Sequence, residues 1–257
     1  MNKIRDAFKN GKAFIPFITC GDPDIATTKQ LITEMAKSGA DIIELGIPFS
    51  DPTAEGPTIQ SANIRALKNG ITTDDIFNMV DEIKQNVSVP LVFMTYANVV
   101  FSYGIEKFVK RMVEVGMSGL ILPDVPFEEK QEFAPICEQY GIDFISLIAP
   151  TSHDRIKMIS KSAKGFVYCV SSLGVTGVRS DITTDIGSMI SLVKEANPSI
   201  PCAVGFGIST PEQAAKMAQT ADGVIVGSAI VKLIGQHGAD SVKPVCEYVS
   251  RMKNSIK

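Results

Sequence analysis

Residues 40–57, ADIIELGIPFSDPTAEGP, join a strand-like run to a loop of proline and small residues. Residues 42–47 are apolar except for Glu44, so the pattern places this carboxylate inside a buried strand. A buried carboxylate is costly unless it is paired, protonated or used in chemistry. A second carboxylate, Glu55, lies in the loop that follows. Glu44 is therefore either a satisfied structural charge or a working acid, and the rest of the chain favours one of these.

The same kind of strand-like run recurs along the chain, separated by segments of helical periodicity. Near-continuous apolar strands that alternate with helices indicate a parallel sheet covered by helices. Eight such units in 257 residues match the α/β fold of a (β/α)₈ TIM barrel, and a doubly wound open sheet is the alternative. The expected strands are 13–19, 41–47, 90–97, 119–124, 143–149, 165–171, 201–207 and 223–229.

Two segments exceed this repeat. Residues 2–11 predict an extra N-terminal helix that closes the bottom of the barrel, and residues 68–86 predict an extra helix after strand 2. No linker or shift in composition marks a second domain. We therefore expect a single barrel domain over residues 1–257.

Composition excludes several classes of function. The net charge is −3 and no basic run occurs, which argues against nucleic acid or an anionic membrane as the partner. No apolar stretch has the length of a signal peptide or a membrane span, so we expect a cytoplasmic protein. Its five scattered cysteines have no C-x-x-C spacing, which favours reduced thiols over a metal site or a disulfide framework.

Side-chain alternation gives Glu44 a direction. Ile43 and Leu45 share the strand face that suits packing against outer helices, whereas Ile42 and Glu44 share the face toward the barrel axis. Glu44 also lies near the C-terminal end of its strand, where TIM barrels build their active sites. These two features favour a catalytic role over a purely structural one.

Glycine-rich turns follow the last three expected strands. In TIM barrels the loops after strands 7 and 8, with a helix N-terminus, commonly bind phosphate through backbone N–H groups. Gly207, Gly227 and Ser228 fit this role, although ordinary turn chemistry would account for any one of these loops. The turns cover residues 170–181, 204–210 and 226–231.

The expected strand ends lack several residue types that catalysis often uses, and this limits the possible chemistry. Neither His153 nor His237 falls at the C-terminal end of a strand, no cluster has metal-ligand spacing, and no lysine is placed to form a Schiff base. Carboxylates are left for acid–base work, and a substrate that loses a carbon–carbon bond must supply its own electron sink. Polar groups expected near them are Tyr96, Asn98, Asp124, Tyr168 and Thr176.

Seven segments, in order, resemble the tryptophan synthase α-subunit family. The resemblance implies a (β/α)₈ barrel that cleaves indole-3-glycerol phosphate into indole and glyceraldehyde 3-phosphate. It also implies an α2β2 heterotetramer in which the β-subunit alone carries pyridoxal phosphate, with no cofactor in this chain. The segments are PFITCGDPD (16–24), ELGIPFSDPTAEGPTIQ (44–60), MTYANVV (94–100), LILPDVPFEE (120–129), YCVSSLGVTGVR (168–179), AVGFGIST (203–210) and ADGVIVGSAIV (221–231).

The resemblance also implies roles for particular residues. Glu44 matches the acid–base residue that moves protons at the indole ring and the side-chain hydroxyl. Thr176 matches a lid residue in a mobile loop, and Asp51 and Pro52 match positions at the β-subunit interface. Residues that match the indole pocket are Phe17, Tyr96, Asn98, Asp124 and Tyr168, and those that match the phosphate site are Gly177, Gly207, Gly227 and Ser228.

Glu55 departs from the family pattern A-D-G-P, in which Asp holds the indole N–H. Glu can serve the same purpose, but its carboxylate lies one methylene further out, and a 1 Å error can cost about 100-fold in rate. The departure keeps open a mainly regulatory subunit with weak lyase activity. Another phosphosugar barrel enzyme, an isomerase or epimerase, is the second alternative.

Overall fold

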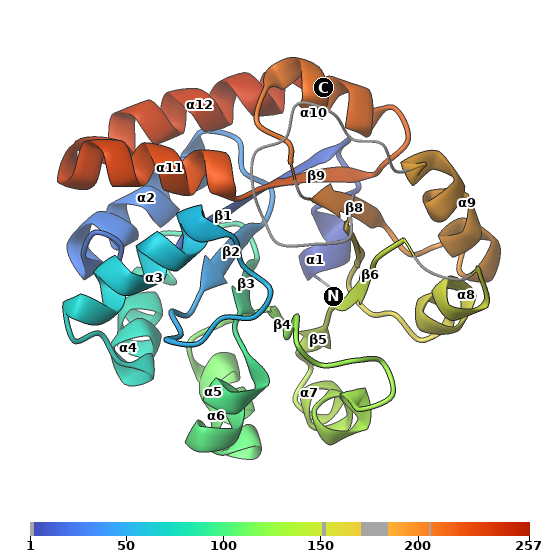
Figure 1. Cartoon of the computed structure of the whole chain (residues 1–257), viewed down its shortest axis with the longest axis horizontal. Coiled ribbons are helices and arrows are strands. Elements are labelled where there is room, and N and C mark those ends of the chain that lie inside the picture. The colour runs from blue at the N-terminus through green and yellow to red at the C-terminus, as the bar shows by residue number, and fades with distance from the viewer. Residues whose placement is uncertain (1–2, 151–152, 171–184, 206) are drawn as a thin grey trace.

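The structure is a computed structural model that describes residues 3–150, 153–170, 185–205 and 207–257. Its strands pair in parallel in the order β5-β4-β3-β2-β1-β9-β8-β7-β6, with helices around them (Figure 1). The two ends of this order, β5 (Asp143–Phe144) and β6 (Ser146–Ile148), are separated in the chain by Ile145 alone. The sheet therefore comes nearly full circle, which confirms the predicted TIM barrel.

One expected strand, 143–149, forms two short segments because β5 pairs with β4 and β6 pairs with β7. The remaining strands are β1 (Ala13–Thr19), β2 (Ile43–Gly46), β3 (Leu91–Met94), β4 (Gly119–Ile121), β7 (Val167–Val170), β8 (Cys202–Gly205) and β9 (Gly223–Val226). The α-helices are α1 (Lys3–Asp6), α2 (Ile25–Lys37), α3 (Pro57–Lys68), α4 (Thr73–Ile83), α5 (Ala97–Tyr103), α6 (Ile105–Glu114), α7 (Ala134–Gln139), α8 (His153–Lys161), α9 (Ile186–Ala196), α10 (Pro211–Ala218), α11 (Ser228–His237) and α12 (Val242–Ser255). Two 3₁₀ turns cover Lys130–Glu132 and Gly238–Ser241.

Both extra helices are present. The α1 helix places Ile4, which is fully buried, in the inner core of the barrel with Ile121 and Phe166. The α4 helix follows α3 and begins with a reciprocal capping box between Thr72 and Asp75, which satisfies two backbone N–H groups at its start. The sequence prediction for these two segments is confirmed.

Most strands end earlier than expected, on the side where the site lies. The expected strand 90–97 ends at Met94, and the expected strand 223–229 ends at Val226. Ala97 and Ser228 instead begin the helices α5 and α11. The residues just beyond the strands are therefore free to form the rim of a pocket.

Side chains of β2 alternate as predicted. Ile43 and Leu45 pack in the outer core beneath the helices, whereas Ile42 packs in the inner core. Glu44 lies in register with Phe17 of β1 and Val92 of β3, and its side chain is fully buried. None of the described helices is both long enough and apolar enough to cross a membrane.

Candidate active site

A pocket opens where the C-terminal ends of the strands meet the start of α11 and the loop before α3. Its wall brings together many of the residues predicted from the sequence: Phe17, Glu44, Glu55, Tyr168, Gly207, Gly227 and Ser228. The sequence analysis did not single out the other lining residues, Ala54, Ile59, Met94, Pro123, Leu147, Ile208 and Ile225. Most of these are apolar, so two carboxylates lie in a wall that suits a flat, apolar ring.

Glu44 is a buried acid whose pKa reflects no counter-charge among the described residues. Within the described part of the chain, neither of its carboxylate oxygens has a hydrogen-bond partner. Burial raises the pKa of Glu44 from its ordinary value of 4.5 to about 8, because the charged form loses its hydration. At neutral pH the side chain therefore holds a proton that it can donate into the pocket.

Two glycines make room for the aromatic walls beside Glu44. A Cβ atom on Gly46 would lie 2.6 Å from Cζ of Phe17, and one on Gly205 would lie 2.5 Å from the hydroxyl oxygen of Tyr168. Real Cβ atoms essentially never come this close to a neighbour, so a side chain at either position would force the adjacent ring to move. Burial, and then the nearby Glu44 carboxylate, raise the pKa of Tyr168, which keeps its hydroxyl protonated.

Glu55 differs from Glu44 because hydrogen bonds support its carboxylate. Asn63 Nδ2 donates to Glu55 Oε2 over 2.6 Å, and the Tyr96 hydroxyl also bonds to the carboxylate. The same tyrosine oxygen accepts the Ala54 N–H over 3.0 Å, which fixes the loop. Burial raises the pKa of Glu55 to about 7, although the bonds from Asn63 and Tyr96 work in the opposite direction. Glu55 is therefore the carboxylate of the pair that ionises more readily.

Three of the predicted phosphate residues, Gly207, Gly227 and Ser228, also line the pocket. Gly227 precedes the first residue of α11, Ser228, and no side chain among the described residues caps this helix start. Its first backbone hydrogen bond runs from Val231 N to Gly227 O, which leaves first-turn N–H groups without intrahelical acceptors. Gly207 adopts a positive φ of 79°, a conformation that glycine permits. The arrangement is suited to an anion.

Some predicted residues lie away from the pocket wall. Asn98 is exposed on α5, and the Asp124 carboxylate accepts the Ala97 N–H at the start of α5, at 3.1 Å from each oxygen. Their roles in binding substrate stay predictions, as does the role of Tyr96 beyond its contact with Glu55. Thr176 and Gly177 lie outside the described residues.

Asn63 is the functional candidate that the sequence analysis missed. It lies on the buried face of α3 together with Ile59, Ala62 and Ala66. A lone amide on an otherwise apolar helix face is a signal that periodicity alone could have provided. Leu147 and Ile225 occupy strand positions whose side chains point toward the barrel axis, so side-chain alternation could have predicted them at the pocket.

A wider groove lies at the opposite end of the strands. Lys3, Ser118 and Asp143 are part of its wall, and the last two lie at the N-terminal ends of β4 and β5. Active sites of TIM barrels form at the C-terminal ends instead. The described residues also contain no group of His, Cys, Asp or Glu that would hold a metal ion. The carboxylate pocket is therefore the candidate active site.

Fold and pocket together define a TIM barrel whose candidate active site contains two carboxylates, Glu44 and Glu55. The model of the tryptophan synthase alpha chain family matches residues 4–257. The chain belongs to this family.

Curated relatives and solved structures agree. The chain is 46% identical to the tryptophan synthase alpha chain of Lacticaseibacillus casei, over all of this chain and 96% of that one. It is 48% identical to that of Thermoanaerobacter pseudethanolicus, over the full length of both. The tryptophan synthase alpha chain of Legionella pneumophila superposes with a TM-score of 0.89 at 36% identity, covering all of this chain and 97% of that one. The Mycobacterium tuberculosis tryptophan synthase structure gives 0.88 at 34% identity, with coverage of 98% and 96%.

Proposed function

We propose that this chain carries out the lyase reaction of its family through Glu44 and Glu55, cleaving indole-3-glycerol phosphate into indole and glyceraldehyde 3-phosphate. The observation that carries the assignment is the fully buried Glu44, whose pKa is raised to about 8 by burial. A general acid is most effective when its pKa lies near the working pH. An acid with an ordinary pKa would have lost its proton at neutral pH.

Glu44 acts twice in the proposed mechanism. Its carboxylic acid gives a proton to C3 of the indole ring, and the ring nitrogen becomes an iminium that can accept electrons. The resulting carboxylate then takes the proton from the side-chain hydroxyl next to the bond that breaks. The electrons of that carbon–carbon bond return to the ring, so indole and the aldehyde leave and Glu44 is again protonated.

Glu55 stabilises the charge that forms on the ring. An ionised carboxylate near the ring N–H balances the iminium, and a preorganised charge of this kind needs no rearrangement during the reaction. Burial raises the pKa of Tyr96 to about 12, so its hydroxyl stays a donor to Glu55 at working pH. The apolar walls formed by Phe17, Ile59 and Leu147 would hold the ring and exclude water.

The phosphate is expected at Gly207, Gly227 and Ser228, against the start of α11. Replacing Ser228 with Asp should raise KM for the substrate by at least about tenfold, because like charges in contact cost more than about 1.4 kcal/mol. The same charge should keep or raise the melting temperature, since an acidic residue favours a helix N-terminus. Steady-state kinetics and thermal melts measure both effects. Ser228→Asn is the neutral control, and equal KM values for the two variants would place the phosphate elsewhere.

A β-subunit is the expected partner, in an α2β2 heterotetramer that carries pyridoxal phosphate in the β-subunit only. Asp51 is exposed and Pro52 half-buried in the loop between β2 and α3, at the same end of the barrel as the pocket. Glu55 lies in the same loop, so a β-subunit bound at Asp51 and Pro52 would contact the segment that carries this carboxylate. A cytoplasmic location stays a prediction from the sequence.

Indole release from indole-3-glycerol phosphate, measured with and without a β-subunit, tests the proposal. Indole formation by the chain alone, increased by the partner, is the expected result. Stimulation of the partner with no indole formed from this substrate would favour the regulatory alternative. Turnover of other phosphosugars without indole release would favour an isomerase or epimerase.

A further inference from the structure

The α3 helix holds Glu55 at both ends of the residue. Gln60 Nε2 donates to the Glu55 backbone carbonyl over 2.8 Å, and Asn63 Nδ2 donates to carboxylate atom Oε2 over 2.6 Å. Residues three apart lie on the same side of a helix, so Gln60 and Asn63 face the loop together. The main chain and the carboxylate of Glu55 are thus placed by one rigid element.

Asn63 is buried where it contacts Glu55, so its amide has few other partners. Asn63 is only 4% exposed, and it stands among apolar residues on the inner face of α3. A buried amide requires hydrogen bonds, because leaving its polar atoms unpaired is unfavourable. Hydrogen bonds to a charged partner are stronger than neutral ones. The amide and the carboxylate therefore hold each other in one geometry.

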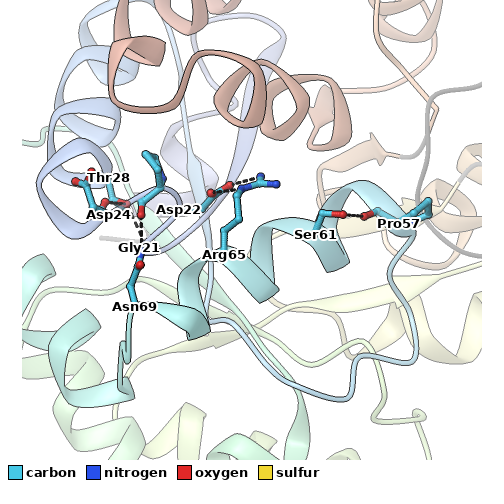
Figure 2. A network of polar contacts seen from close by, with 9 residues as sticks. Gly21, Asp22, Asp24, Thr28, Pro57, Ser61, Arg65 and Asn69 are labelled. Carbon is cyan, nitrogen blue, oxygen red and sulfur yellow. Dashed lines mark hydrogen bonds and ion pairs between the residues drawn. The ribbon is translucent and has the colours of Figure 1, made fainter.

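The far end of α3 is tied to the loop after β1. Arg65 Nε and Nη2 donate to the two carboxylate oxygens of Asp22 over 2.7 and 2.8 Å, and Asp22 is 1% exposed. Asn69 Nδ2 donates to the Pro23 carbonyl over 2.6 Å. Figure 2 shows Arg65 and Asn69 reaching from this helix toward the Asp22 segment. A two-bond guanidinium–carboxylate contact fixes orientation as well as distance, so α3 cannot easily shift along its axis.

We propose that Asn63 is a positioning residue that sets the Glu55 carboxylate at the point where the ring N–H of the substrate binds. This inference rests on the proposed role of Glu55 and deepens it. The longer glutamate side chain has one more rotatable bond than aspartate. The Asn63 amide restricts that freedom by binding one carboxylate oxygen, Oε2.

Kinetics of Asn63→Ala in two backgrounds test the proposal. With Glu55 present, we expect turnover to fall about 10- to 100-fold, which corresponds to the 1.5–3 kcal/mol of a hydrogen bond to a charged group. The acidic limb of the pH profile should move to higher pH, because a bond that lowers the pKa of Glu55 is lost. With Glu55→Gln present, Asn63→Ala should cause little further loss.

A matched control separates positioning from stability. Ser61→Ala removes an exposed side-chain hydrogen bond to the Pro57 carbonyl on the same helix, and it should leave turnover and the pH profile near those of the parent. Should Asn63→Ala fold poorly, Asn63→Ser is the second variant. Its hydroxyl can bond to the helix backbone, but it is too short to reach Glu55, so it should show the same kinetic defect.

A rescue gives the sharpest outcome. Glu55→Asp withdraws the carboxylate by one methylene, and Asn63→Gln extends the amide by one, so the double variant should recover turnover relative to Glu55→Asp alone. Equal losses from Asn63→Ala in both backgrounds, with an unmoved pH limb, would overturn the positioning role and leave that of Glu55 intact. Full turnover in Glu55→Gln would instead overturn the proposed role of Glu55 itself.

Discussion

Replacing Glu44 with Gln is expected to slow indole release by at least about 100-fold, because the amide keeps the shape of the side chain but has no acidic proton to donate. The loss should appear in kcat more than in KM, since ring and phosphate contacts are unchanged. Turnover equal to that of the parent would return Glu44 to the role of a structural charge.

The pH profile of the parent provides a second readout. Glu44 must be protonated, so kcat/KM should fall as the pH rises through about 8. Glu55 must be ionised, so kcat/KM should fall as the pH drops below about 7. The residual activity of Glu44→Gln should lack the alkaline limb that Glu44 causes.

The stability of Glu44→Gln is the control, because the substitution should lower activity but raise stability at high pH. Burial raises the pKa of Glu44 to about 8 in the folded chain, from an ordinary 4.5, so the folded state binds the proton more tightly than the unfolded state. The stability that this proton provides is present at pH 4 and is lost as the pH rises through 8. Glu44→Gln should therefore match the parent near pH 4 and exceed it at pH 9, by on the order of a few kcal/mol. Thermal melts at both pH values would separate a damaged fold from a lost acid.

The barrel was predictable because its signals are local and repeated. Each β-strand is short, apolar and followed by a helical period, and the alternation of Ile42, Ile43, Glu44 and Leu45 gave the inward face correctly. The strand ends were less predictable. At Ala97 and Ser228 the chain turns into helices while its residues still favour strands, because the helix start depends on the arrangement of neighbouring strands.

The site was predictable where chemistry marks the sequence. Glu44 stands out inside an apolar run, and the glycine turns stand out after strands, so the structure could bring them to one pocket. Asn63 was harder to predict, because its partner Glu55 lies eight residues away across a loop whose path the sequence does not show. Asp124 follows an expected strand, and its carboxylate accepts the first N–H of α5, so its role in binding substrate stays a prediction.

Glu55→Gln tests the second carboxylate and should reduce indole release by about 100-fold or more. The Gln side chain can still accept hydrogen bonds from Asn63 and Tyr96, so the fold and phosphate binding should persist. What it lacks is the negative charge that balances the iminium in the pocket. Single-turnover kinetics and phosphate binding by calorimetry measure the two effects separately, and full activity in this variant would overturn the catalytic role of Glu55.

Glu55→Asp asks whether the site is built for the longer side chain. If the loop were unadapted, Asp would restore the usual geometry of the family and the reaction would become faster. The structure favours the opposite result, because Asn63 and Tyr96 meet the carboxylate where the Glu side chain places it, with an Nδ2–Oε2 distance of 2.6 Å. Shortening the side chain by one methylene would break at least one of these contacts and open a gap to the ring N–H. A misplacement of about 1 Å costs up to about 100-fold, so we expect Glu55→Asp to be slower than the parent and to regain activity when Asn63 is lengthened to Gln. A faster Glu55→Asp enzyme would show that the support from α3 is incidental and that glutamate is tolerated here, not required.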